Sequence, residues 1–422
     1  MKKILALIVI IFAIVAPVNA EVVRISADEA VQLALENNLT LQSKRKEVDI
    51  LKQEVKMANA LKNPQLQANI LTGSISKANS SQAGVALPIE ISKRGVRKKA
   101  AIARLNRIED QIRQEELNLK IDVMSAYFDV VYMKTIVAIL KQREELFKEM
   151  EIVANSKPKN SLNYEIEKLQ SDMKHKKQVI LLNKAKADLL CAQFHLNEVL
   201  NLKNANSVMY DARETSLFQE HISLLAIEIP EYKKIEDIAM KYSYSIRISD
   251  DNIAISKAEL KQAKHLVIPD LTVAGGYAYS SDGKTQGAFI GGSLDMPLLY
   301  TYRPEVNRAK IILERAKIDR VSFENQLKFA LKQDYNKFKY AKENMNYYKD
   351  ILQDSETILQ MSRDRYAKGQ TVLLNVFIIE NSHKDILNEY IDAMQIYYRA
   401  YLELMHNVGH DLLLDESVFE DI

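Results

Sequence analysis

Cysteine, proline and glycine are all scarce in this chain of 422 residues, which limits the covalent links and the helix breaks that it can contain. The single cysteine, Cys191, rules out a disulfide within the chain. Eight prolines and 11 glycines leave long stretches that can be helical without interruption. The formal charge of +2 falls to zero without Lys2 and Lys3, so no basic field indicates a nucleic-acid partner.

Long apolar runs are confined to the N-terminus. Lys2 and Lys3 precede 13 apolar residues, from position 4 to 16, and the small residues around Ala20 suit a signal peptidase. This run is too short to span a bilayer as a helix. It predicts a signal peptide over residues 1–20, and Glu21 in place of a cysteine argues against a lipoprotein. We expect no later segment to approach a transmembrane helix.

The glycines that are present gather in one stretch. Six of the 11 fall between residues 268 and 304, where apolar residues alternate at the period of a strand around the turn signal Asp282-Gly283. The pattern predicts a β-hairpin over residues 270–298. A weaker copy, which contains Gly73 and Gly84, predicts a second hairpin over residues 65–89.

The remaining chain has the pattern of long helices. We expect helices from about 26 to 63, 96 to 155, 163 to 202, 304 to 368 and 372 to 406. Ser26 and Glu29 have the spacing of a capping box at the first of them. The two longest carry apolar residues at intervals of seven, a coiled-coil stripe: Leu105, Ile112, Leu119, Ala126, Met133, Leu140 and Phe147, and then Leu331, Phe338, Met345, Leu352, Leu359 and Tyr366.

The second half of the chain repeats the first. Pro64-Gln65-Leu66 aligns with Pro269-Asp270-Leu271 at an offset of 205, and Pro88 aligns with Pro297 at an offset of 209. We therefore divide the chain into a signal peptide (1–20), a first repeat (21–202), an irregular connector (203–230), a second repeat (231–410) and a C-terminal tail (411–422). Each repeat is helix, β-hairpin, long helix, turn and helix.

Four short strands cannot close into a barrel alone, so the pattern predicts a barrel shared between chains in an outer membrane. The alternative is a soluble periplasmic coiled-coil bundle with decorative hairpins, which would be a structural or adaptor protein. No Gly-x-Ser-x-Gly, phosphate loop or HExxH occurs. His406 and His410 have the spacing of a metal pair, although two surface histidines are the simpler interpretation. We expect no catalytic, cofactor or metal site.

The duplicated plan and the segment Arg365-Tyr366-Ala367-Lys368-Gly369, followed by residues 372–376, resemble the TolC family of outer-membrane efflux proteins. Pro88-Ile89-Glu90 with Lys93-Arg94-Gly95 resembles its cobalt–zinc–cadmium (CzcC-like) branch. The resemblance implies a homotrimer with a 12-strand barrel and a helical periplasmic tunnel. It also implies a periplasmic adaptor and an inner-membrane pump as partners. The exit duct of a type I protein secretion system is an alternative function.

The resemblance also implies where sites lie. It makes the turn residues Arg365, Tyr366, Gly369 and Pro158 candidates for adaptor contact. Asn163 and Asn375 stand where relatives have acidic gate residues, and both could instead be N-caps of the helices that follow; Glu380 could supply a gate charge. From their place around the second hairpin, four tyrosines are candidates for an interfacial belt: Tyr277, Tyr279, Tyr300 and Tyr302.

Overall fold

The computed structural model describes residues 21–71, 80–156, 164–203, 208–217, 230–280, 286–368 and 370–409. They form a mainly helical chain with a small β part, as the sequence predicts. The chain divides into two compact units. Unit 1 comprises Met1–Gln42, Glu115–Ala239 and Phe329–Ile422, and unit 2 comprises Ser43–Gln114 and Met240–Lys328.

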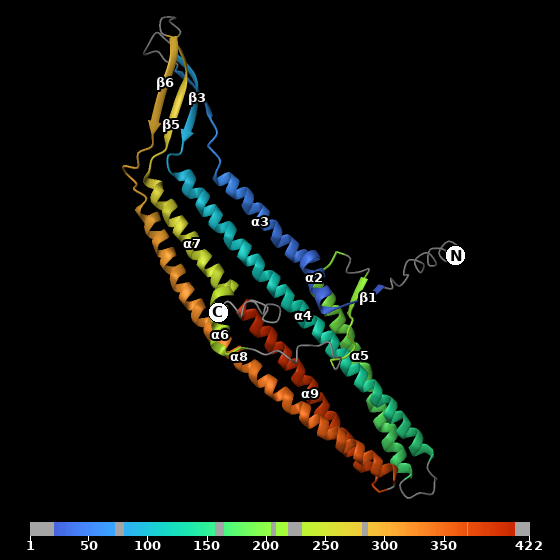
Figure 1. Ribbon diagram of the computed structural model, residues 1–422. Helices are drawn as coiled ribbons and strands as arrows, with labels where there is room; N and C mark the ends of the chain where they lie inside the picture. The colour runs from blue at the N-terminus through green and yellow to red at the C-terminus, as the bar shows by residue number, and fades with distance from the viewer. Residues whose placement is uncertain are drawn as a thin grey trace, which may run out of the picture. The chain divides into compact units, whose positions relative to one another are not determined.

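Unit 2 holds both predicted hairpins, which are confirmed. Strands β2 (Gln65–Leu71) and β3 (Ser80–Ile89) form the first, and β5 (Leu271–Ser280) and β6 (Gln286–Leu294) form the second. They join in one antiparallel sheet of order β2-β3-β5-β6. The sheet extends from one end of the helices of this unit (Figure 1).

The helices of unit 2 come from both repeats. They are the greater part of α3 (Leu39–Ala58), α7 (Tyr244–Lys264) with the short 3-10 helix η2 (His265–Val267), and the first parts of α4 (Lys93–Ser156) and α8 (Arg303–Ala367). Ion pairs connect α7 to both long helices: Arg247 contacts Asp110 of α4 at 2.7 Å, and Arg320 of α8 contacts Asp250 at 2.9 Å.

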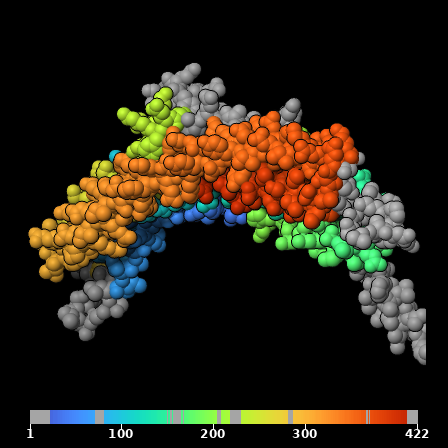
Figure 2. Space-filling model, turned by 90° about the horizontal axis from the view of Figure 1, so that it is seen from below, coloured from blue at the N-terminus to red at the C-terminus, as the bar shows by residue number. Residues whose placement is uncertain are grey.

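Unit 1 contains the main apolar core. Its elements include α2 (Ala27–Asn37), α5 (Tyr164–Leu200), α6 (Tyr232–Tyr242) and α9 (Leu373–Val408), together with the later parts of α4 and α8. Tyr397 and Tyr401 of α9 are fully buried, and their rings pack against Phe338 of α8. Figure 2 shows α8 in orange and α9 in red lying along each other on one face of this unit.

Three expectations from the sequence are corrected by the fold. Helix 26–63 is in fact two helices, α2 and α3, separated at Asn38. The Asn38 side chain accepts a hydrogen bond from the Leu41 amide and donates one to the Val199 carbonyl, both at 3.0 Å. The same break separates α6 from α7 at Ser243, the position that aligns with Asn38 at the offset of 205.

The connector 203–230 is the second correction, because residues Val208–Ala212 form strand β4. This strand pairs in parallel with β1 (Glu21–Ile25), which comes directly after the predicted signal peptide. The third correction concerns α4, whose part Lys93–Glu149 contains a window long and apolar enough to cross a membrane by length and composition. Its apolar side chains include Val123, Tyr127 and Val130, which are buried in the core of unit 1.

Candidate functional site

The four strands carry no charged side chain, although 27% of all residues in the chain are charged. The pairing register divides their side chains between two faces, because directly paired residues of an antiparallel sheet point to the same side. One row across the sheet is Leu66, Val85, Gly275 and Ile290, and another is Leu87, Val273 and Gly292. This face, which we call the apolar face, has Leu66 and Ile290 90% and 85% exposed.

The opposite face, which we call the polar face, carries small and polar side chains. Its rows include Gln67, Gly84, Gly276 and Phe289, and then Gln82 with Ala278 and Gly287. A sheet that is apolar on one side and small or polar on the other suits a wall between lipid and water. The alternation is visible in the sequence of β5, whose Leu271, Val273, Tyr277 and Tyr279 all belong to the apolar face, whereas in β6 glycine occurs on both faces.

Both edges of the sheet are open. Strands β2 and β6 lie at its two ends, and no further strand of the described residues pairs with either. Strands β3 and β5 have ten residues each, the length of a transmembrane β-strand. An open, uncharged edge has unpaired backbone groups that a bilayer cannot hydrate, so this sheet requires further strands to be stable there.

The two hairpins meet at a seam without side chains. Gly84 of β3 is paired with Gly276 of β5, and the backbones approach so closely that a Cβ on Gly276 would lie 2.2 Å from the Ala83 carbonyl oxygen. The Phe289 ring covers this seam on the polar face, where a Cβ on Gly84 would lie 3.0 Å from its Cζ. Here glycine is needed for close approach of two strands.

The predicted aromatic belt residues lie toward opposite ends of the strands. Tyr277 and Tyr279 belong to the apolar face near the hairpin turns, and each is about half exposed. Tyr300 and Tyr302 follow the other end of β6, with ring centroids 5.2 Å apart, and the Tyr300 hydroxyl donates to Glu305 at 2.7 Å. Aromatic residues at both ends are the arrangement expected at two membrane–water interfaces.

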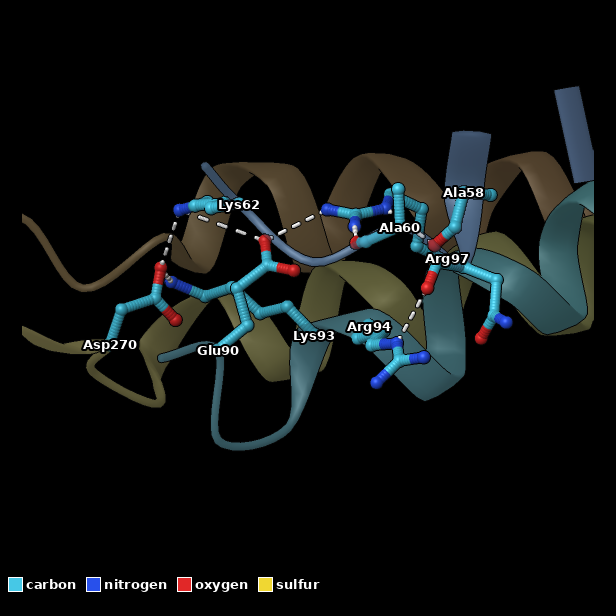
Figure 3. Close-up of polar contacts among 9 residues, drawn as sticks. Ala58, Ala60, Lys62, Glu90, Lys93, Arg94, Arg97 and Asp270 are labelled. Atoms are coloured by element: carbon cyan, nitrogen blue, oxygen red, sulfur yellow. Dashed lines mark hydrogen bonds and ion pairs between the residues drawn. The ribbon is translucent and has the colours of Figure 1, made fainter. Parts of the chain in front are cut away.

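Charge begins at the ends of the strands that adjoin the helices. Ile89, Leu271 and Leu294 form the last row of the apolar face, and each is followed or preceded by an acidic residue. Two of these acids, Glu90 and Asp270, are bridged by Lys62 at 3.7 and 3.3 Å (Figure 3). A wall that crosses a membrane needs such an abrupt limit between uncharged and charged residues.

Arginine side chains attach the start of α4 to the end of α3. Arg94 donates to the Asn59 carbonyl at 2.7 Å, and Arg97 donates to the Ala58 carbonyl at 3.0 Å and to Glu90 at 2.8 Å (Figure 3). Carbonyls at a helix C-terminus lack partners within the helix and attract cations. The motif of Glu90, Lys93 and Arg94 noted in the sequence is therefore part of the strand–helix junction.

Among the predicted turn residues, only Arg365 is described with its side chain. Gly369, Pro158 and Asn163 lie outside the described residues, as do the side chain of Tyr366 and His410. Arg365 is exposed, and its carbonyl accepts a hydrogen bond from the Gln370 amide at 2.9 Å.

Asn375 is not the N-cap of the helix that follows it, contrary to one interpretation of the sequence. Val372 holds that position, and its side chain makes no capping bond. Asn375 lies in the first turn of α9, where it is exposed and donates to the Thr371 hydroxyl at 3.1 Å. Its amide is therefore accessible, as a gate residue requires.

Glu380 is buried inside unit 1, beside Arg143 of α4. Its carboxylate lies 3.7 Å from the Arg143 guanidinium, and burial lowers the pKa of Arg143. One Glu380 oxygen and two Arg143 nitrogens have no hydrogen-bond partner. On the same side, Lys174 of α5 lies 3.7 Å from the Phe377 ring centroid, and burial lowers the pKa of that lysine too. Arg143 and Lys174 have no sequence signal, since nothing along the chain marks which charges face inward.

Comparison with known proteins locates the fold but not a sequence family. No family model and no curated protein matches the sequence. Solved structures do match: CusC, a transmembrane channel, at a TM-score of 0.74 and 13% identity, covers 92% of this chain and 93% of its own. The open outer-membrane channel MtrE of Neisseria gonorrhoeae matches at 0.74 and 14%, covering 91% and 89%.

A third structure, the CmeC outer-membrane channel of Campylobacter jejuni, matches at a TM-score of 0.65 and 16% identity, covering 94% of this chain and 88% of its own. These neighbours are TolC-like channel proteins and not enzymes. At such low identity the likeness is one of fold. The chain therefore has the fold of TolC-like outer-membrane channels over nearly its whole length.

Proposed function

We propose that this chain is the outer-membrane exit duct of a tripartite efflux system in a Gram-negative-type cell. The strands would cross the outer membrane and the helices would occupy the periplasm, where an adaptor protein and an inner-membrane pump would complete the system. The cargo would be small molecules or metal ions. The observation that carries the proposal is the uncharged sheet with one apolar face and two open edges.

The open edges support a homotrimer, because three copies of four strands make a 12-strand barrel. Exposed apolar stripes on the helices of unit 1 support the same assembly. On α5 the side chains of Ile166, Leu169, Met173 and Ile180 are more than half exposed, at the spacing of a helix seam. On α8 the exposed stripe consists of Tyr340, Tyr347, Ile358 and Met361.

Two finer assignments concern the branch of the family and the periplasmic mouth of the duct, and each has a single supporting observation. The motif around Glu90 and Lys93 supports the cobalt–zinc–cadmium branch of the family by resemblance alone. The accessible amide of Asn375 supports an uncharged ring at the periplasmic mouth, which would attract cations less than a ring of carboxylates does.

The proposal is tested by placing one charge on either face of β6. Ile290 is at the middle of the strand on the apolar face, and its neighbour Gly291 faces the other way, where an added Cβ meets open space. An arginine facing lipid at mid-membrane costs roughly 2–4 kcal/mol. We expect Ile290→Arg to lower the amount of assembled protein in the outer membrane, whereas Gly291→Arg at the same depth assembles. Equal assembly of both variants would contradict a lipid-facing apolar face.

A further inference from the structure

The helix ends next to the sheet are unusually basic. We define the basic collar as residues 52–64, 90–99, 258–270 and 295–310, the helix ends and linkers that adjoin the four strands. These segments contain 13 lysines and arginines but six aspartates and glutamates, whereas the whole chain has 58 and 56. The positive charge of the chain is therefore concentrated directly beside its uncharged sheet.

Contacts within the chain account for part of this charge. Lys62 and Lys93 form ion pairs with Asp270, and Arg97 forms one with Glu90, so both acidic residues of the junction already have cationic partners. Other cations of the collar are left over. Lys98 and Lys99 follow in α4, where Lys99 is exposed, and neither forms an ion pair within the described part of the chain.

The position of these cations is unfavourable unless something else compensates. The first turn of α4 contains no acidic residue, although the N-terminus of a helix favours negative charge. Lys93, Arg94, Arg97, Lys98 and Lys99 all lie within the first seven residues of this helix. Contacts within the chain compensate Lys93, Arg94 and Arg97, so an external anion would serve Lys98 and Lys99.

An apolar segment lies in the same collar. Between β6 and α8 the side chains of Met296, Leu298 and Leu299 are exposed, Leu299 completely, and Tyr300 is half exposed. They follow Leu294, which lies in the last row of the apolar face, directly along the chain. Apolar side chains, a tyrosine pair and unpaired lysines, all in segments that adjoin the same end of the sheet, match the boundary between acyl chains and headgroups.

We propose that the basic collar binds the phosphate headgroups of anionic phospholipids in the membrane leaflet on the helix side of the sheet. This rests on the proposed function, because it needs the sheet to cross a bilayer. The uncharged strands place the acyl region, and the collar begins where they end, so lipid phosphates lie at the level of the leftover lysines. A soluble acidic protein would satisfy the charge but would not account for the exposed leucines.

The test uses the full mature chain, purified in an uncharged detergent, and a short-chain phosphatidylglycerol as the probe. Lys98→Gln/Lys99→Gln removes two charges of the collar. Lys141→Gln/Lys148→Gln removes two exposed charges of the same helix outside the collar. A lysine near an anionic surface contributes about a fivefold change in affinity, so the first double variant should bind the lipid roughly 25-fold more weakly at low salt. The control variant should bind as the wild type does.

Two further measurements make each outcome decisive. Phosphatidylcholine and inorganic phosphate are titrated in parallel, and binding equal to that of phosphatidylglycerol by either would overturn the assignment to anionic lipid. Unchanged affinity of Lys98→Gln/Lys99→Gln would overturn it as well. Membrane fractionation and oligomer analysis of the wild type and of each variant separate the two proposals. A wild-type chain that assembles in the outer membrane without lipid preference refutes the collar alone, and a wild-type chain that does not reach the membrane refutes the duct.

Discussion

The glycine seam between the hairpins allows a sharp test of how the sheet is built. Gly84 and Gly276 face each other across β3 and β5, and a methyl group at Gly276 would lie 2.2 Å from the Ala83 carbonyl oxygen and 2.5 Å from the Gly84 Cα. Both of these atoms are backbone, so no side-chain rotation can relieve the contact. Gly276→Ala must therefore push the two hairpins apart.

The magnitude follows from the size of that displacement. Carbon and oxygen need more than 3 Å, so the strands must separate by about 1 Å, which weakens their hydrogen bonds over several pairs. Inserting one methyl group into a closely packed site costs roughly 1–3 kcal/mol. A cost of about 2 kcal/mol per chain corresponds to roughly a 30-fold change in the unfolding equilibrium.

The same sheet supplies matched controls. An added Cβ at Gly291 meets open space, and at Gly275 its nearest neighbour is 3.6 Å away. We expect Gly276→Ala to lower the midpoint of urea unfolding of the detergent-solubilised oligomer, and Gly275→Ala and Gly291→Ala to change it little. The reasoning is refuted if all three variants unfold alike, because replacement of a strand glycine would then act through the unfolded chain and not through the seam.

Three more predictions address the helices. Burial and then the neighbouring Asp110 carboxylate raise the pKa of Asp251 from 3.8 to about 6. Between these pH values the folded chain binds a proton that the unfolded chain releases, so stability falls as the pH rises. Asp251→Asn should therefore unfold at higher urea concentration than the wild type near pH 8 and at the same concentration near pH 4. Glu380→Gln leaves the Arg143 guanidinium buried without its partner and should lower the free energy of unfolding in urea by about 3 kcal/mol. The double variant Glu380→Leu/Arg143→Met should restore most of this loss, and no recovery would contradict the pairing. Asn375→Asp should strengthen block of single-channel current by a trivalent cation added on the periplasmic side, and strong block that is unchanged by the substitution would show that another acidic ring is present.

The sequence predicted helix limits and hairpins correctly where residues close together in the chain determine them. The capping box of Ser26 and Glu29 is formed, with the Ser26 amide donating to the Glu29 carboxylate at 2.8 Å. Both long helices end within a few residues of their expected limits, since glycine and proline mark those limits along the chain. The two hairpins follow from the clustered glycines and from Asp282-Gly283.

Features that depend on distant partners were missed. The helix break at Asn38 requires the carbonyl of Val199, 161 residues away, and nothing near Asn38 announces it. The pairing of β4 with β1 likewise joins the connector to the segment directly after the predicted signal peptide. Arg143 was overlooked for the same reason, because its partner Glu380 comes from the other repeat.

The register of the sheet adds what alternation along one strand cannot show, namely which residues of the neighbouring strands share its face. Val85 and Gly275 belong to the apolar face and Gly84 and Gly276 to the polar face, so a glycine occurs on either side at neighbouring positions. The pairing register distinguishes the faces. Val85 is paired with Leu66 and with Gly275, and Gly275 is paired with Ile290, so these residues share one side of the sheet. Each strand contributes two to four large apolar side chains to that side, and four strands from two repeats together make a continuous surface. The duplication is therefore what turns four weak strand signals into one apolar wall, and a single repeat would provide only half of it.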